Sequence, residues 1–350
     1  MRLDFDTIPR MHRREFLICT AAGSAVVAGA RNAIAQDARP PAPPLDNGAP
    51  AKVSAEKLAR LSMLSWNFNS RLKVEGEPPS PDRVLEVFDL PQYYADVYGM
   101  HNVELQHTHF ASTETSYLKE FRARIEKVKS RNSQINVEFD EGIVQQNISV
   151  ENPVMRYQAL DLTMRWVDHA VIMGCPRVMV NQGRLTPESL PRATVALKLM
   201  GEYAKTKGVK ISVETRGGGY GRGGRGRGGR GRGGETAAAS ATPAPATPPP
   251  EAPPGPPAWK VLQELVEGAG CYSNCDIGGV AARDQESLHV AIKSLAPSNS
   301  GNMHIKTSPN WDLATAIRFI NSDLGYKGLY SIEVNPQRVR EVYETILANI

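Results

Sequence analysis

The segment Lys210-Ile211-Ser212-Val213-Glu214 decides how this chain can fold. Apolar and polar residues alternate along it, as is typical of a β-strand, and it ends in a carboxylate. Alternate residues of a strand share a face, so Val213 can face covering helices while Glu214 faces the opposite side. Three later segments follow helical stretches and also end in potential metal ligands, at Asp276, His304 and Glu333. At one edge of a parallel sheet, these four side chains could meet.

Strands and helices alternate along the rest of the chain. Apolar residues at helical spacing, such as Leu118, Phe121 and Ile125, separate the predicted strands, and Thr186 with Pro187 predicts the start of the helix before Lys210. Eight such alternations favour a closed parallel α/β barrel. A doubly wound open sheet is the alternative, but it does not explain ligands at several separate strand ends. The strands are expected at residues 62–67, 102–106, 135–139, 178–181 and 210–214 and in segments ending at 276, 304 and 333.

The first 53 residues are expected to lie outside the barrel. Arg13-Arg14-Glu15-Phe16-Leu17 precedes an Ala- and Gly-rich apolar stretch and a small-residue cleavage site at 33–35, so residues 1–35 predict a twin-arginine signal peptide and a periplasmic protein. The apolar stretch is shorter than the ~20 residues that span a bilayer, so no stable membrane anchor is expected. Residues 36–53 are Pro-rich and predict a flexible tether. The barrel should then occupy residues 54–350.

Residues 216–257 interrupt this barrel with Arg-Gly repeats followed by Ala, Pro and Thr runs. These residues offer too little apolar surface to offset the conformational entropy lost when the chain is ordered. We therefore expect a disordered insertion after the fifth strand. The repeats could also hold single-stranded nucleic acid or adhere to anionic envelope polymers. Of the net charge of +4, however, the first 35 residues carry +2 and residues 216–257, with six Arg and two Glu, carry +4, which leaves −2 for the rest. We therefore expect no specific nucleic-acid partner.

Cysteine spacing gives no sign of a disulfide. Cys271 and Cys275 lie four residues apart on a predicted strand. At ~3.3 Å per residue their Cα atoms would be about 13 Å apart, beyond the ~7 Å that a disulfide tolerates.

The four strand-end residues have the chemistry of a divalent metal site. Glu214, Asp276, His304 and Glu333 offer carboxylate oxygens and one imidazole. Hard ions prefer oxygen ligands and tolerate an imidazole, which favours Mn²⁺, Mg²⁺ or Co²⁺, with Zn²⁺ as a further candidate. We expect this metal site at the carboxyl-end rim of the parallel barrel, which is where enzymes with α/β barrels have their active sites.

The chain resembles the xylose isomerase-like TIM-barrel superfamily of sugar phosphate isomerases and epimerases, over residues 61–350 without the insertion. The resemblance is carried by segments around the strand ends, at residues 103–110, 211–215, 275–278, 303–306 and 331–335. It implies that Glu214, Asp276, His304 and Glu333 bind one divalent metal ion, as in the ketose 3-epimerases. Two departures stand out. Gly279 occupies the position of a sugar-binding His, and no Asp-x-His pair near His304 supports the three-zinc cluster of the apurinic endonucleases.

The function we predict is metal-assisted proton transfer next to a carbonyl of a small carbohydrate, through an enediolate, by an isomerase or epimerase. Glu214 and Glu333 would act as base and acid, and Lys306 would either steady the oxyanion or pair with a site carboxylate. A 3-keto-sugar or glycoside lyase or hydratase on the same metal site is the first alternative. A non-catalytic envelope-binding protein acting through the Arg-Gly tract is the second. Further rim residues that could bind substrate are His107, His109, Glu138 and Asn181, with a loop contact as the alternative role of either His.

Overall fold

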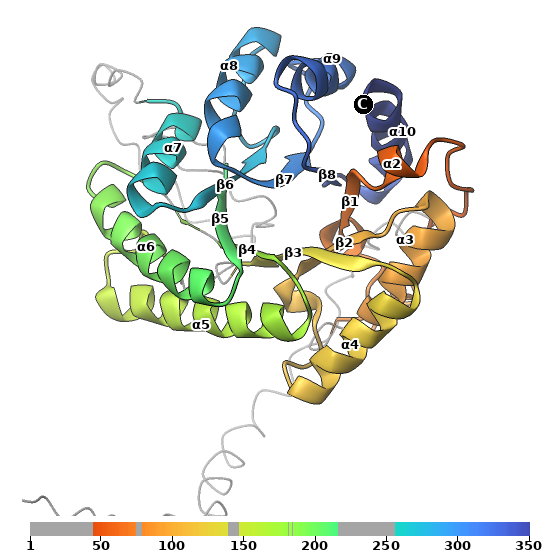
Figure 1. The fold of residues 1–350 in the computed structure, drawn as a ribbon, viewed down its shortest axis with the longest axis horizontal. Coiled ribbons are helices and arrows are strands. Elements are labelled where there is room, and N and C mark those ends of the chain that lie inside the picture. Colours follow the sequence, from red (N-terminus) through yellow and green to blue (C-terminus); the bar gives the residue numbers. More distant parts are fainter. Residues whose placement is uncertain (1–44, 75–78, 139–146, 181, 184, 216–255) are drawn as a thin grey trace, which may run out of the picture. The chain divides into compact units, whose positions relative to one another are not determined.

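Eight parallel strands close into a barrel in chain order, each pairing with the next and β8 with β1 (Figure 1). The computed structural model describes residues 45–74, 79–138, 147–180, 182–183, 185–215 and 256–350. This closed barrel confirms the predicted fold class and excludes the open sheet. The strands are β1 (Leu61–Leu64), β2 (Asn102–Gln106), β3 (Arg131–Val137), β4 (Arg177–Val180), β5 (Lys210–Glu214), β6 (Tyr272–Asp276), β7 (Asn299–Ile305) and β8 (Leu329–Ile332).

Helices form a ring around the strands (Figure 1). In the described part of the chain, no helix is long and apolar enough to cross a membrane. The longer helices are α3 (Leu90–Tyr98), α4 (Thr115–Lys127), α5 (Pro153–Ile172), α6 (Leu190–Thr206), α7 (Ala258–Ala269), α8 (Gln285–Leu295), α9 (Leu313–Arg318) and α10 (Val339–Asn349). Shorter helical segments are α2 (Ala55–Leu58), η1 (Ser65–Phe68), η2 (Val87–Asp89), η3 (His107–His109), η4 (Ala296–Ser298), η5 (Phe319–Asp323) and η6 (Pro336–Arg338).

The lumen of this barrel is polar. Glu104 on β2 contacts His304 and Asn302 on β7, although β2 and β7 are not neighbours in the barrel, so these side chains meet inside it. Val103 and Leu105, the alternate residues of β2, are also fully buried and belong to the hydrophobic core. Strands buried on both faces usually read as continuous apolar runs. The alternation in this sequence therefore reflects an apolar layer beneath the helices and a hydrogen-bonded interior.

Several element boundaries differ from those expected. The helix expected to begin at Pro187 begins later, at Leu190. Thr186 caps the turn before it, because its hydroxyl accepts a hydrogen bond from the N–H of Ser189. β1 ends at Leu64 and gives way to η1, whose turn the alternation of residues 62–67 did not predict. β3 begins four residues earlier than expected, at Arg131.

The segment of residues 45–53, expected to be part of a flexible tether, contacts the barrel. The guanidinium of Arg340 on α10 lies 2.8 Å from the carboxylate of Asp46, and Tyr93 on α3 donates a hydrogen bond to the Asp46 carbonyl. The backbone N–H of Ala51 donates to the hydroxyl of Tyr343 at 3.0 Å. Contacts with the barrel thus extend at least to Leu45, which packs against the core. The predicted signal peptide and the first part of the tether lie outside the described residues.

The predicted insertion falls between β5 and α7, where the sequence places it. Of residues 216–257, only the last two are described, so the expected disorder is not tested. The three described cysteines, Cys175, Cys271 and Cys275, are buried and free.

Candidate metal centre

Three of the four predicted ligands converge at the carboxyl ends of the strands. Glu214 is the last residue of β5, His304 lies one residue before the end of β7, and Glu333 directly follows β8. Strand pairing aligns His304 with Asp276 on β6 and with Ser331 on β8, which brings these strand ends to one level. The tertiary fold therefore gathers residues that are about 30 to 120 positions apart in the sequence.

The imidazole of His304 is the centre of this cluster. Its Nδ1 lies 2.9 Å from Glu214 Oε1 and 2.8 Å from Glu333 Oε2. One ligand atom from each of the three side chains lies within 4.8 Å of the other two. His304 and Glu214 are buried and Glu333 is partly buried, so the cluster has one side open toward the rim.

Asp276, the fourth predicted ligand, is not part of this group of three. Its Oδ2 lies 2.6 Å from the Nζ of Lys306, and its Oδ1 accepts a hydrogen bond from the N–H of Gly278. Lys306 Nζ also lies 2.8 Å from Glu333 Oε1. The salt bridge that was one of two expected roles for Lys306 is therefore present, and it links Asp276 to the cluster through Glu333.

Sequence reasoning missed one buried carboxylate, that of Glu104. Its Oε1 lies 2.6 Å from the Nε2 of His304, on the lumen side of the ring. Glu104 is fully buried. A charged residue between Val103 and Leu105 in a buried strand is a signal for an inward-facing functional group, because an unpaired carboxylate is too costly to bury. That signal was available in the sequence.

The electrostatics of the site follow from this packing of charges. Burial opposes ionisation of Glu104, but the His304 charge and the hydrogen bonds that Glu104 accepts lower its pKa below the ordinary value. Burial likewise disfavours the charged form of His304, but Glu104 and Glu333 raise its pKa well above normal. Burial raises the pKa of Asp276 to about 6, against the opposing charge of Lys306. Four carboxylates thus face two basic side chains.

A divalent cation fits this arrangement. The four carboxylates are Glu104, Glu214, Asp276 and Glu333, and the two bases, His304 and Lys306, leave an excess of two negative charges. Glu333 Oε2 is buried and has no hydrogen-bond partner among the described residues, although His304 lies close to it. Buried polar atoms normally have a partner, so an unpartnered carboxylate oxygen facing the cluster favours a bound cation there.

The remaining rim residues differ in their surroundings. His109 is buried, and its two ring nitrogens lie 2.9 Å from Ser65 Oγ and 3.1 Å from Asn69 Oδ1. Its ring stacks on Trp66, and burial lowers its pKa to about 3. These contacts fit the expected alternative role of a loop contact.

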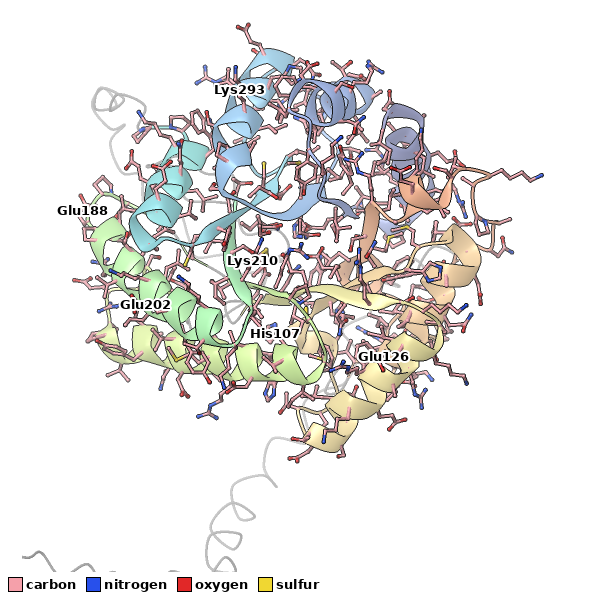
Figure 2. All side chains as sticks on the ribbon, viewed as in Figure 1. His107, Glu126, Glu188, Glu202, Lys210 and Lys293 are labelled. Carbon is pink, nitrogen blue, oxygen red and sulfur yellow. The ribbon has the colours of Figure 1, made fainter. Side chains whose placement is uncertain are left out.

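His107 and Glu138 lie together. The backbone N–H of Glu138 donates to His107 Nδ1 at 3.2 Å, and the His107 ring packs edge-on against Trp166 of α5. Figure 2 labels His107 among the side chains of the barrel. Burial lowers the pKa of His107 to about 4, so it is neutral at physiological pH. The structure leaves His107 partly exposed, and its role as a sugar contact stays a prediction. Asn181 lies outside the described residues.

Gly279, which the sequence resemblance aligns with a sugar-binding His, has no room for a side chain. A Cβ at this position would lie 1.8 Å from the carbonyl oxygen of Thr215 and 2.8 Å from Asp276 Oδ2. The departure from the pattern is therefore built into the packing of the β6 loop against the end of β5. A sugar contact at this site would have to come from another residue.

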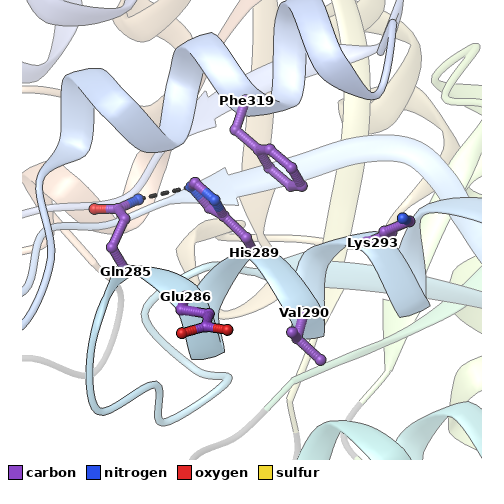
Figure 3. A pocket seen from close by; sticks show the side chains of 6 residues that line it. All are labelled: Gln285, Glu286, His289, Val290, Lys293 and Phe319. Atoms are coloured by element: carbon purple, nitrogen blue, oxygen red, sulfur yellow. Dashed lines mark hydrogen bonds between the residues drawn. The ribbon is translucent and has the colours of Figure 1, made fainter.

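A separate pocket of about 380 Å³ lies on the outside of the barrel (Figure 3). It lies along α8, and His289 stacks on Phe319 inside it at a centroid distance of 3.9 Å. None of its lining residues belongs to the ligand cluster. The lining consists of Gln285, Glu286, His289, Val290, Lys293 and Phe319.

Comparison with solved structures shows the fold class of this chain. A xylose isomerase domain protein from Planctomyces limnophilus matches with a TM-score of 0.54 at 12% identity, covering 83% of this chain and 96% of that one. D-psicose 3-epimerase from Clostridium cellulolyticum H10 matches with a TM-score of 0.54 at 10% identity, covering 83% and 96%. For 3-keto-D-glucoside 4-epimerase from E. coli the TM-score is 0.53 at 12% identity, with coverage of 83% and 100%.

The chain therefore has a TIM-barrel fold like that of these proteins, as the resemblance of its sequence implies. At these identities, the likeness is one of fold. No protein-family model matches the sequence, and no curated protein matches it.

Proposed function

We propose that this protein is a metal-dependent sugar isomerase or epimerase. The observation that carries the proposal is the convergence of Glu214, His304 and Glu333 at the carboxyl-end rim of the barrel, with an unpartnered carboxylate oxygen between them. The fold adds support, since two of the solved structures named above are described as sugar epimerases. The substrate class we propose is a small carbohydrate with a carbonyl next to a hydroxyl-bearing carbon.

Glu214, His304 and Glu333 would hold the cation, and Asp276 would join them as fourth ligand if Lys306 moved off its carboxylate. A bound divalent ion would polarise the substrate carbonyl and lower the cost of the enediolate. Mn²⁺, Mg²⁺ and Co²⁺ suit a site of carboxylates with one imidazole. The residues around it determine the rest of the chemistry.

Glu214 and Glu333 are the residues we expect to move the proton. They come from β5 and β8 and reach the same imidazole nitrogen from different strands. A carboxylate on each side of the substrate allows one to remove the proton and the other to return it on the opposite face, which inverts the carbon centre. Lys306, whose Nζ lies 2.8 Å from Glu333, would lie next to the oxygen that becomes negative.

Two measurements test the proposal. Metal analysis of protein purified from its own compartment should find about one divalent ion per chain. A screen of free and 3-keto sugars in D₂O should then show deuterium at the carbon next to the carbonyl of the true substrate. A protein that holds no metal and exchanges no substrate proton after Mn²⁺, Mg²⁺ and Co²⁺ addition contradicts the proposal.

Glu333→Gln provides the matching variant. It should abolish turnover, at least a 10²-fold loss, because an amide cannot accept the proton. The fold should persist, since Glu333 lies at a loop start. Circular dichroism and the melting temperature check this, and Glu341→Gln, an exposed carboxylate paired with Arg338, is the control. Retained turnover would remove Glu333 from the mechanism.

A lyase acting on 3-keto sugars or glycosides is the second candidate. It is favoured by the fold likeness to a protein described as a 3-keto-D-glucoside epimerase, because the same base can start either reaction. Elimination creates a double bond and loses a leaving group, whereas epimerisation conserves the mass of the substrate. Ultraviolet absorbance of an enone and the product mass therefore distinguish the two.

A further inference from the structure

The ring of His304 has a different partner on each of its two nitrogens. Nδ1 faces Glu214 and Glu333 at the rim, whereas Nε2 faces Glu104 in the lumen at 2.6 Å. We propose that Glu104 is a positioning residue that holds His304 with its Nε2–H toward the lumen and thereby sets the affinity of the site for a divalent cation. The inference rests on the proposed function, because it assumes a cation at Nδ1.

Glu104 is itself held rigidly. Its Oε1 accepts hydrogen bonds from His304 and from the amide of Gln134 at 2.9 Å. Its Oε2 accepts from the amide of Asn302 at 3.0 Å and from the hydroxyl of Ser331. All four partners can donate, which is the environment of a carboxylate rather than a carboxylic acid. The partners come from β3, β7 and β8, so the barrel wall fixes the Glu104 carboxylate from three sides.

This environment dictates which nitrogen of His304 can bind a metal. The Glu104 carboxylate can only accept, so Nε2 must carry a hydrogen. In neutral imidazole one nitrogen donates and the other has a free lone pair, so Nδ1 is left to coordinate. The Nδ1 atom is also the one that lies near Glu214 and Glu333. A carboxylate behind a ligating His fixes the tautomer and orientation of the ring and makes it a better ligand.

No catalytic duty falls to Glu104, because the imidazole of His304 stands between it and the rim. A Glu104 variant therefore tests metal binding separately from proton transfer, because it should weaken metal binding without removing either rim carboxylate. A merely structural carboxylate would affect the stability of the barrel but not the affinity of the folded protein for metal.

The experiment is a calorimetric titration of metal-free protein with Mn²⁺, well below the melting temperature of each variant. Glu104→Gln keeps the size of the side chain but removes its charge, and it should weaken the affinity about 10- to 100-fold. Ser62→Ala is the matched control, because Ser62 is fully buried in a neighbouring strand and bonds to Ser133 and to the carbonyl of Asn102, away from Glu104. Its affinity should remain within about twofold of wild type.

A second variant tests the inference if the Glu104→Gln protein does not fold. Gln134→Met removes one donor to Glu104 Oε1 and touches no proposed ligand, so it should weaken Mn²⁺ binding several-fold. ¹⁵N-histidine spectra of the Mg²⁺-loaded wild-type protein add an independent readout. They should show His304 as the Nε2–H tautomer, identified by the signal that His304→Gln loses.

The outcomes separate the two proposals. Wild-type protein that binds no divalent cation overturns both the proposed function and this inference. Wild-type protein that binds Mn²⁺ while Glu104→Gln, or Gln134→Met if the former does not fold, binds it equally well overturns the inference alone. An Nδ1–H tautomer of His304 in the loaded protein also overturns it.

Discussion

At the scale of single residues, the site depends on a missing side chain as well as on those that are present. Gly279 lets the loop after β6 lie against the carbonyl of Thr215, and the hydroxyl of Thr215 accepts from the N–H of Asp276 and donates to its carbonyl. This contact fixes the end of β6 beside that of β5. The position of Asp276 near the cluster therefore depends on the absence of a side chain at Gly279.

Gly279→Ala should accordingly destabilise the protein by about 1–3 kcal/mol, because the added Cβ meets backbone that cannot move aside. Urea unfolding measures the change. Gly268→Ala is the control. Gly268 lies in α7, where Ala is favoured over Gly by up to about 1 kcal/mol, and the added Cβ would meet only the side chain of Thr194, at 3.1 Å. Equal stabilities for the two variants would contradict the close approach at Gly279.

At the scale of elements, residues 45–53 tie the N-terminal side of the described chain to α3 and α10. Arg340 donates to the Asp46 carboxylate and to the carbonyls of Ala49 and Val97, and its guanidinium lies over the ring of Tyr98. One side chain thus links the segment to two helices that are far apart in sequence. Composition alone predicted a free tether, because Pro-rich sequence gives no sign of a distant Arg partner.

Asp46→Asn should release this segment at a cost of about 1 kcal/mol or less, as is typical of a partly exposed ion pair. Burial raises the pKa of Asp46, but hydrogen bonds and charge from Arg340 outweigh it and lower the pKa. A lowered folded-state pKa stabilises the protein above the unfolded value of about 3.9, and this contribution is lost as pH falls through the folded-state pKa.

The difference in unfolding free energy between wild type and Asp46→Asn should therefore be present at pH 7 and should decline as the pH falls below about 4. Urea unfolding across pH 3–7 measures it, and hydrogen exchange at residues 45–53 locates it. A difference that persists unchanged at pH 3 would mean that the Asp46 charge does not hold the segment.

At the scale of the whole molecule, the barrel carries a long insertion without losing closure. In the chain, residues 216–257 lie between β5, which ends at Glu214, and α7, which begins at Ala258. Loop-closure entropy grows only slowly with length, so such an insertion costs the barrel little. The catalytic and envelope-binding interpretations predict different results when the insertion is removed.

Replacing residues 217–255 by a short Gly-Ser linker should leave Mn²⁺ affinity within about twofold of wild type. It should raise stability by roughly 1 kcal/mol, because a shorter loop costs less entropy to close. Calorimetric titration and thermal unfolding measure these. Loss of function with unchanged metal affinity would favour the alternative in which the Arg-Gly tract carries the activity.

We also propose that residues 1–35 direct export by the twin-arginine route. Replacing both Arg13 and Arg14 by Lys should keep the protein out of the periplasm, because that route reads the paired arginines. Cell fractionation with a periplasmic marker measures the result, and Arg31→Lys, a basic residue outside the motif, is the control. Export that is unaffected by the double change would rule out this route.

The sequence by itself determined the alternation of strands and helices, the barrel, and the strand ends that carry Glu214, His304 and Glu333, because period and strand length are local properties of the chain. Only the tertiary structure decided which of those side chains meet. Asp276 pairs with Lys306, and Glu104 stands behind His304, because contacts across a closed lumen join strands that no local pattern links. Local sequence sets the face on which a side chain lies, whereas its partner depends on how the barrel closes.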